Sequence, residues 1–219
     1  KPEEKDAYFL RGSAELELGD YESAKADFDQ AISMDPKNYD RLIEIYEALA
    51  DYGYREVGQE YLQNVLDTAK QLDAYDSGRI YYYLGDYQKA YLALEEAKGK
   101  GGVDSYLYLG KAYAATGDYN YASSVYSNYL SKQGPDAEIY NQLGLCELAK
   151  KDYQKALEAF QAGKQIEGNS LMQTLSFNEI VAYEYLQDYQ KAAVLLNAYL
   201  QNYPDDQAAI REQQFLSTR

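Results

Sequence analysis

The sequence contains no histidine, no tryptophan and a single cysteine among its 219 residues. Without histidine, the chain cannot form a Ser-His or Cys-His nucleophile pair or a histidine-ligated metal site. One cysteine, Cys146, cannot make an intrachain disulfide or a thiolate zinc site. We expect Cys146 to be a buried, unreactive thiol, because nothing nearby in the sequence would lower its pKa. These absences exclude metal sites built from histidine or paired cysteines, and we expect the chain to bind neither a metal nor a cofactor.

Basic residues are also scarce, because 21 Lys and Arg face 36 Asp and Glu and leave a net charge of −15. This charge argues against binding to nucleic acid or to anionic lipid surfaces, both of which reward Lys and Arg. No apolar run approaches the roughly 20 residues that cross a bilayer, so we expect no direct bilayer insertion by this segment. The first 70 residues carry −9 of the total charge, which either attracts a basic partner or keeps the protein soluble.

Tyrosine, in contrast, occurs 27 times, and five tyrosines mark an internal repeat. The segment Asp-Tyr-Gln-Lys-Ala begins at Asp86, Asp152 and Asp188, and related segments begin at Asp20 and Asp118. The tyrosines of these five segments are 66, 32, 34 and 36 residues apart. The longest gap leaves room for a diverged sixth copy around residues 50–54. A period near 34 residues predicts six stacked supersecondary units.

Each copy has the pattern of two helices. In the first copy, Gly19 suits a left-handed helix C-cap and Asp20 suits the next N-cap. Pro36 ends the second helix, because proline cannot donate a helical hydrogen bond. The second helix carries apolar residues at i, i+4, i+7 and i+8, namely Ala24, Phe28, Ala31 and Ile32. This spacing predicts one buried helix face in every copy.

The pattern resembles the tetratricopeptide repeat (TPR) over essentially the whole chain. In the first copy the resemblance rests on Tyr8, Gly12, Gly19, Tyr21, Ala24, Phe28, Ala31 and Pro36. The fold that this implies is all-α, a right-handed α-solenoid of about six TPR helical hairpins plus a C-terminal capping helix. We expect a single domain over residues 1–219, with repeats at about 5–38, 39–70, 71–102, 103–136, 137–170 and 173–206 and the capping helix at 207–219.

Small residues recur where the two helices of one copy should approach closely. Gly12, Gly110 and Gly144 lie on first helices, and alanines face them from the second helices. The second copy departs from this pattern, because it has Tyr46 where glycine is usual and Gly58 where alanine is usual. We expect this exchange to move bulk from one helix to the other. The third copy ends in a flexible turn over residues 99–102 in place of a proline stop.

The resemblance also implies that first helices line a concave groove in which ligands bind. The candidate ligand-binding residues in this groove are Tyr75, Arg79, Tyr82, Tyr83, Tyr108 and Lys111. Arg79 and Lys111 fall at the same position of successive repeats, so we expect them to be neighbours. A cationic pair flanked by tyrosines would suit an acidic or C-terminal peptide segment. The alternative is that Arg79 forms an internal ion pair with Glu47, one repeat earlier.

The predicted function is therefore a non-catalytic TPR scaffold that binds a peptide or partner protein through its concave groove. One alternative is a binding module for a carbohydrate or small ligand that uses groove tyrosines. An enzyme acting through carboxylates is a third class, but regular helical spacing favours a solvated acidic face instead. Self-association is a further mode of interaction, since exposed end repeats can stack on each other.

The tyrosine-rich acidic composition also bears on the compartment. Together with few cysteines and a first residue other than methionine, it resembles exported or lipid-anchored repeat proteins of bacteria. We therefore expect such a protein, with an N-terminal signal upstream of Lys1. A cytoplasmic location is the alternative.

Overall fold

The computed structural model describes residues 2–100 and 102–219, which contain thirteen α-helices and no β-strand. The chain divides into two compact units, which we call unit 1 (residues 1–96) and unit 2 (residues 97–219). The predicted all-α helical-repeat fold is confirmed. One continuous right-handed domain across both units stays a prediction. The predicted turn over residues 99–102 includes Gly101, which lies outside the described residues.

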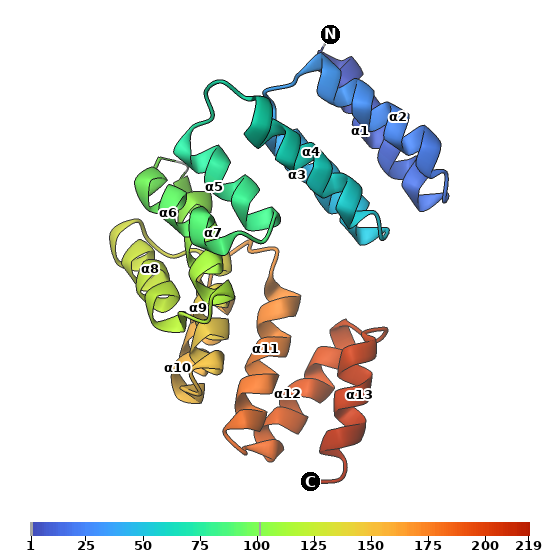
Figure 1. Ribbon diagram of the computed structural model, residues 1–219. Helices are drawn as coiled ribbons and strands as arrows, with labels where there is room; N and C mark the ends of the chain where they lie inside the picture. The colour runs from blue at the N-terminus through green and yellow to red at the C-terminus, as the bar shows by residue number, and fades with distance from the viewer. Residues whose placement is uncertain (1, 101) are drawn as a thin grey trace. The chain divides into compact units, whose positions relative to one another are not determined.

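The helices alternate as first and second members of hairpins (Figure 1). Unit 1 is built from α1 (Pro2–Glu17), α2 (Tyr21–Met34), α3 (Tyr39–Asp51), α4 (Arg55–Thr68), α5 (Ala74–Tyr83) and α6 (Tyr87–Ala97). Unit 2 contains α7 (Gly102–Ala115), α8 (Tyr119–Lys132), α9 (Ala137–Ala149), α10 (Tyr153–Lys164), α11 (Met172–Tyr185), α12 (Tyr189–Asn202) and the final helix α13 (Gln207–Leu216). No helix within these described ranges has the length and apolar character that spanning a membrane requires.

The turn inside each hairpin follows from the repeated Asp-Tyr pair. Asp20 caps α2 by accepting the Ser23 backbone N–H at 3.2 Å, and aspartates at the same position cap α8, α10 and α12. The residue before the cap has a positive φ, which Gly19 adopts at 80° without strain. Lys151 adopts 64° at the same position of the fifth repeat. The turn geometry is therefore kept even where glycine is absent.

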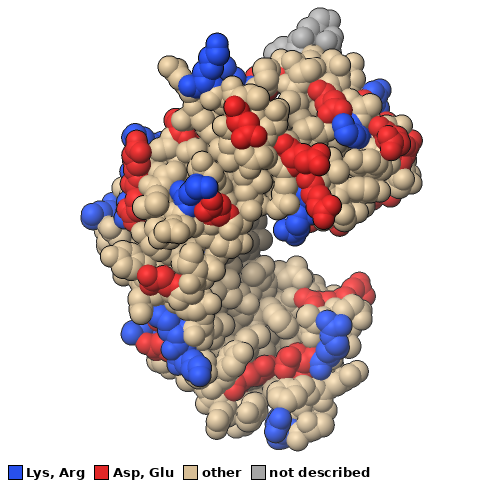
Figure 2. Space-filling view, viewed as in Figure 1, with Lys and Arg blue, Asp and Glu red and all other residues tan. Residues whose placement is uncertain are grey.

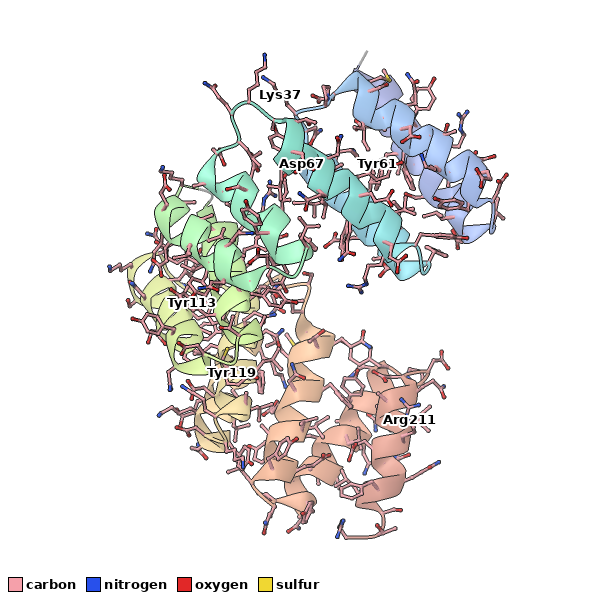
Figure 3. The ribbon with its side chains drawn as sticks, in the orientation of Figure 1. Lys37, Tyr61, Asp67, Tyr113, Tyr119 and Arg211 are labelled. Carbon is pink, nitrogen blue, oxygen red and sulfur yellow. The ribbon has the colours of Figure 1, made fainter. Side chains whose placement is uncertain are left out.

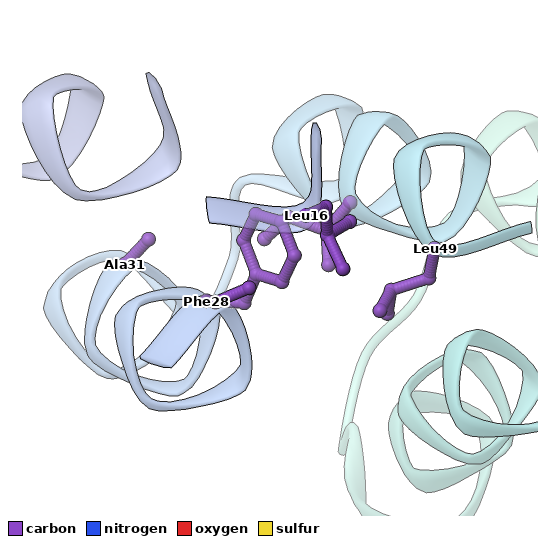
Figure 4. Packing of buried hydrophobic residues seen from close by; sticks show 6 residues of the cluster. Leu16, Phe28, Ala31 and Leu49 are labelled. Atoms are coloured by element: carbon purple, nitrogen blue, oxygen red, sulfur yellow. The ribbon is translucent and has the colours of Figure 1, made fainter. Parts of the chain in front are cut away.

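Hairpins bury their apolar faces against one another. In unit 1, Leu16 of α1, Phe28 and Ala31 of α2, and Leu49 of α3 belong to one buried cluster (Figure 4). A polar contact joins the same hairpins, because Tyr61 of α4, which is labelled in Figure 3, donates its hydroxyl to Asp29 of α2 at 2.5 Å. In unit 2, a second cluster combines residues of α11, α12 and α13. Stacking supplies the core that no hairpin could form alone.

The glycines of the first helices lie under large side chains of the second helices. A Cβ atom on Gly110 would lie 2.2 Å from the ring of Tyr126, and one on Gly144 would lie 2.3 Å from the ring of Phe160. Both rings are fully buried. The predicted close approach of the paired helices is therefore confirmed. Gly78 on α5 makes the same approach to Leu94.

The second hairpin reverses this arrangement, as predicted. Tyr46 of α3 is 4% exposed and occupies the position of the usual glycine. The missing side chain is on α4, where a Cβ on Gly58 would lie 2.9 Å from the Tyr46 ring. The bulk has moved from one helix to the other while the helices stay close.

The final helix α13 begins at the cap Asp206, as expected for a capping helix. It brings Glu212 against Glu184 of α11, and Glu184 Oε1 is buried without a hydrogen-bond partner among the described residues. Burial, together with the charge of Glu212, raises the pKa of Glu184 to about 7. Glu184 therefore keeps its proton to a higher pH than an exposed glutamate would.

Adding a methyl group at a close helix approach should destabilise the fold. We expect Gly144→Ala to lower the free energy of unfolding by about 1–3 kcal/mol, because the Phe160 ring has no room to retreat. Gly163→Ala is the matched control and should cost less, since its new Cβ would lie 3.0 Å from a Leu175 methyl and 3.2 Å from the Tyr140 Cβ, against 2.3 Å from the Phe160 ring at Gly144. Urea unfolding followed by circular dichroism measures both, and equal losses would contradict the packing argument.

The Glu184–Glu212 pair should make stability depend on pH. Because the pKa of Glu184 is raised from 4.5 in the unfolded chain to about 7 in the folded state, the folded state holds this proton more tightly. The resulting stabilisation of the fold is fully present below pH 4.5 and is lost as the pH rises through 7. We expect Glu184→Gln to remove about 1 kcal/mol of this pH dependence between pH 5.5 and 8, after allowance for solvent screening. Thermal unfolding at both pH values tests this, with the exposed Glu17→Gln as control. An unchanged pH dependence in Glu184→Gln would refute it.

Candidate functional site

A pocket of about 420 Å³ lies beside α3 and α5 of unit 1. We call it the tyrosine pocket, and it is lined by Tyr46, Glu47, Ala50, Asp51, Arg55, Tyr82, Tyr83 and Tyr87. Two of the predicted groove residues, Tyr82 and Tyr83, are among them. Four tyrosines around one pocket offer large apolar surface together with polar hydroxyl groups.

The tyrosine rings support one another through edge and tilted contacts. Tyr82 lies 5.4 Å from Tyr83 in a T-shaped arrangement and 5.7 Å from Tyr87. Tyr83 lies 5.2 Å from Tyr46, which is the bulky residue that replaced glycine on α3. Tyr87 is the first residue of α6 and follows the repeated Asp-Tyr turn, which fixes its backbone position. The repeat scaffold therefore fixes the ring positions before any ligand arrives.

Charged groups stand among the rings. The Tyr83 hydroxyl donates to Glu47 Oε1 at 2.5 Å, and Arg55 Nη1 donates to the Tyr46 hydroxyl at 3.3 Å. Asp51 and Arg55 are both exposed to solvent. The pocket thus combines two carboxylates and one guanidinium with aromatic surface. It can hold a side chain by ring contacts and fix its polar end by hydrogen bonds.

Tyr75 and Arg79 lie nearer the start of α5 and do not line this pocket. Arg79 is 6% exposed and donates to Asp40 at 2.5 Å and to Asp76 at 2.6 Å. Its guanidinium carbon lies 4.3 Å from the centre of the Tyr75 ring. The predicted Arg79–Glu47 ion pair is wrong, because Arg79 pairs with Asp40, which lies about two helical turns nearer the start of α3 than Glu47 does. The internal pairing of Arg79 itself is present.

The carboxylates keep Arg79 charged despite its burial. Burial is the largest influence and lowers the pKa of Arg79, but the hydrogen bonds to Asp40 and Asp76 raise the pKa above its ordinary value. Burial raises the pKa of Asp76, and the contact with Arg79 opposes it. This geometry makes Arg79 a structural ion-pair centre between α3 and α5.

Tyr108 and Lys111 lie on α7 in unit 2. Lys111 Nζ is 3.5 Å from Glu138 of α9, with about a third of its side chain exposed. The expected proximity of Lys111 to Arg79 stays a prediction, because the two residues belong to separate units. The predicted groove residues thus occupy three places: the tyrosine pocket, the Arg79 ion-pair centre and α7.

A larger groove of about 630 Å³ lies between α4 and α6 of unit 1. Its lining is mostly charged or amide side chains, and its Lys89 already pairs with Asp86 at 2.7 Å. The Lys89 ammonium also lies 5.3 Å from the centre of the Tyr81 ring. The tyrosine pocket is the better candidate, because it concentrates aromatic surface beside accessible charges.

Six of the eight residues that line the pocket are not among the predicted groove residues, namely Tyr46, Glu47, Ala50, Asp51, Arg55 and Tyr87. Tyr46 was noticed only as a departure from the repeat, and Tyr87 only as a turn residue. Arg55 carried no signal, because its neighbours in the pocket come from other helices. Cys146, expected to be inert, is buried, and burial raises the pKa of its thiol to about 12. Across the described residues, no group of three or more Cys, Asp and Glu side chains is arranged to hold a metal ion.

Comparison with protein families gives three matches, each described as a tetratricopeptide repeat. They cover residues 5–38, 107–170 and 177–206, which together exceed half of the chain. The first coincides with the predicted first repeat. No curated protein matches the chain.

Solved structures with the same fold include two proteins named for pili. PilW, a widely conserved type IV pilus biogenesis factor, is 15% identical with a TM-score of 0.68 over 97% of each chain. PilF of Pseudomonas aeruginosa is 17% identical with a TM-score of 0.58 over 100% of this chain and 99% of its own. YrrB, described as a TPR protein with an unusual peptide-binding site, is 20% identical with a TM-score of 0.56 over 85% of this chain and 97% of its own. At these identities the likeness shows the fold alone.

The ion-pair role of Arg79 can be tested by its removal. We expect Arg79→Ala to lower the free energy of unfolding by about 2 kcal/mol, because it leaves Asp76 half-buried without its cation. Lys111→Ala, which removes a longer and more exposed pair, should change stability by less than about 0.5 kcal/mol. Urea unfolding measures both. Unchanged stability in Arg79→Ala, with loss of ligand affinity, would instead make Arg79 a ligand contact.

Proposed function

The chain belongs to the tetratricopeptide repeat family, and we propose that it is a non-catalytic scaffold that docks a segment of a partner protein in the tyrosine pocket. TPR hairpins form protein-interaction scaffolds, because stacked repeats present extended surfaces for a partner. The single observation that carries the proposal is the pocket itself, with four tyrosine rings and three charged side chains at one place.

The chemistry of the pocket suits a polypeptide segment. Tyrosine combines a large contact area with little side-chain entropy to lose, and for this reason it is enriched where binding energy concentrates. The hydroxyls and the charges of Glu47 and Arg55 can pair with main-chain or side-chain groups of a peptide. A protein of the same fold, YrrB, has a peptide-binding site, which supports peptides as ligands.

The other predicted contacts have different places in this proposal. Arg79 holds α5 against α3 through Asp40 while it lies over the Tyr75 ring, and so it helps to position Tyr82 and Tyr83 on the same helix. Tyr108 and Lys111 form a separate proposed contact on α7, available to a longer partner. A carbohydrate or small ligand remains the competing occupant of the tyrosine pocket, because aromatic rings also stack on sugars.

Selection from a random peptide library displayed on phage tests the proposal. We expect the wild-type chain to enrich a set of peptides. These peptides should bind the double variant Tyr82→Ala/Tyr87→Ala at least tenfold more weakly than the wild type, since removing each aromatic anchor costs more than about 1 kcal/mol. Tyr121→Ala is the matched control, because Tyr121 is 58% exposed and lies in unit 2. Circular dichroism and melting temperature confirm that each variant is folded.

Two outcomes would overturn the proposal. One is that no peptide is enriched, in which case a thermal-shift screen tests glycans and small molecules as the competing ligands. The other is that enriched peptides bind Tyr82→Ala/Tyr87→Ala as tightly as the wild type. In the second case the peptide site lies elsewhere on the chain.

A further inference from the structure

Unit 1 holds its own arginines in a recurring arrangement of one aromatic ring and two carboxylates. Arg41 of α3 is an example, because its guanidinium carbon lies 4.1 Å from the centre of the Phe9 ring. Its two terminal nitrogens pair with Asp6 at 2.7 Å and with Glu44 at 2.8 Å. The ring face and the carboxylates attract the same cation, so their contributions act together.

Two other arginines are held in the same way. Arg79 lies over Tyr75 between two aspartates, as described above. Arg11 lies 5.4 Å from the centre of the Tyr8 ring, with Asp27 at 2.5 Å and Glu15 at 3.7 Å. We call this arrangement the arginine cradle. In all three cradles of unit 1, an aromatic ring and two carboxylates hold a cationic side chain.

The tyrosine pocket contains the components of a fourth cradle. Glu47 and Asp51 supply two carboxylates, and Tyr82 and Tyr87 supply rings. Glu47 accepts one hydrogen bond from Tyr83, but a carboxylate offers about four acceptor positions. Arg55 lines the same pocket and donates to the Tyr46 hydroxyl. In the part of the chain that the structure describes, no salt bridge joins Arg55 to either carboxylate.

The charge of the surrounding unit has the matching sign. Residues 1–96 contain 22 acidic and 10 basic side chains, a net charge of −12, whereas the rest of the chain carries −3. On the face that Figure 2 shows, Asp and Glu side chains gather over the first four helices. A basic segment would be drawn to unit 1 before any close contact forms.

From these observations we infer that the tyrosine pocket holds a lysine or arginine side chain of the partner. The inference rests on the proposed docking function and adds the chemistry of the ligand. The guest cation lies against the tyrosine rings with its charge at Glu47 and Asp51. The inferred ligand is basic, whereas the sequence analysis predicts an acidic peptide. The difference arises because Arg79, on which the acidic ligand depended, is paired with Asp40 and Asp76 inside the fold.

Arg55 gives the inference a distinctive signature. It carries the same charge as the proposed guest and borders the same pocket, so it opposes the guest electrostatically. Removing its charge should therefore strengthen the binding of a basic peptide. If the pocket instead held an acidic peptide, Arg55 would be the main contact and its removal would weaken binding.

The test uses the peptides enriched in the selection described above. We expect them to share a Lys or Arg at one position, and replacement by citrulline for Arg or norleucine for Lys should weaken binding about tenfold. The double variant Glu47→Gln/Asp51→Asn should bind the basic peptide about tenfold more weakly and should bind the neutral analogue with unchanged affinity. Arg55→Gln should strengthen the basic peptide. Isothermal titration calorimetry at two salt concentrations measures these affinities, which should fall with added salt for the basic peptide only.

Glu56→Gln/Glu60→Gln is the matched control, because it removes the same charge from unit 1 at the α4–α6 groove. This control should lower the affinity for the basic peptide by less than about twofold, because only long-range electrostatic attraction is lost. If this control weakens binding as much as Glu47→Gln/Asp51→Asn, the effect is general and the inference is wrong. Enriched peptides without a shared basic residue, or with a shared acidic residue lost in Arg55→Gln, would overturn the inference and leave the docking function intact. Failure to enrich any peptide would overturn both.

Discussion

The fold depends on close contact between two helices of one hairpin, where a small residue lies beneath a large side chain. Gly110 under Tyr126 and Gly144 under Phe160 leave no space for a Cβ atom. Because the large ring fills the gap, the hairpin becomes a thin unit with apolar faces on its two sides. Neither face is satisfied within the hairpin, so successive hairpins must bury each other. The spacing of helices within each unit follows from this one constraint.

The candidate site lies at the hairpin in which the large and the small residue exchange helices. In the second hairpin the large residue is Tyr46 on the first helix, and the small one is Gly58 on the second. Tyr46 packs against Gly58, and it also lines the tyrosine pocket and contacts Tyr83. A local exception to the repeat therefore gives unit 1 an aromatic surface that a glycine at this position would not provide. Departures from a consistent pattern are expected at functional places.

In unit 1, three arginines are used in internal ion pairs, while the carboxylates at the tyrosine pocket are accessible. Three arginines of unit 1 are engaged by carboxylates of neighbouring helices, and each lies over an aromatic ring. These pairs tie α1, α2, α3 and α5 together and engage the three cations within the fold. What remains accessible around the tyrosine pocket is mainly negative. The proposed preference for a basic segment follows from the two carboxylates, Glu47 and Asp51, and the tyrosine rings that line this pocket.

The sequence by itself determined the repeat, the hairpins, their aspartate caps and the exchange of Tyr46 and Gly58. These features depend on contacts between residues close in the chain, whose spacing is fixed by helix geometry. Of the predicted groove residues, Tyr82 and Tyr83 line the tyrosine pocket and Tyr75 and Arg79 do not, and ligand binding by any of them stays a prediction. Only the tertiary structure decided that Arg79 pairs with Asp40, 39 residues away, and that Arg55 and Tyr46 join the pocket. Such partners are chosen by the rotation and offset between neighbouring hairpins, which many packed side chains set together and no single motif encodes.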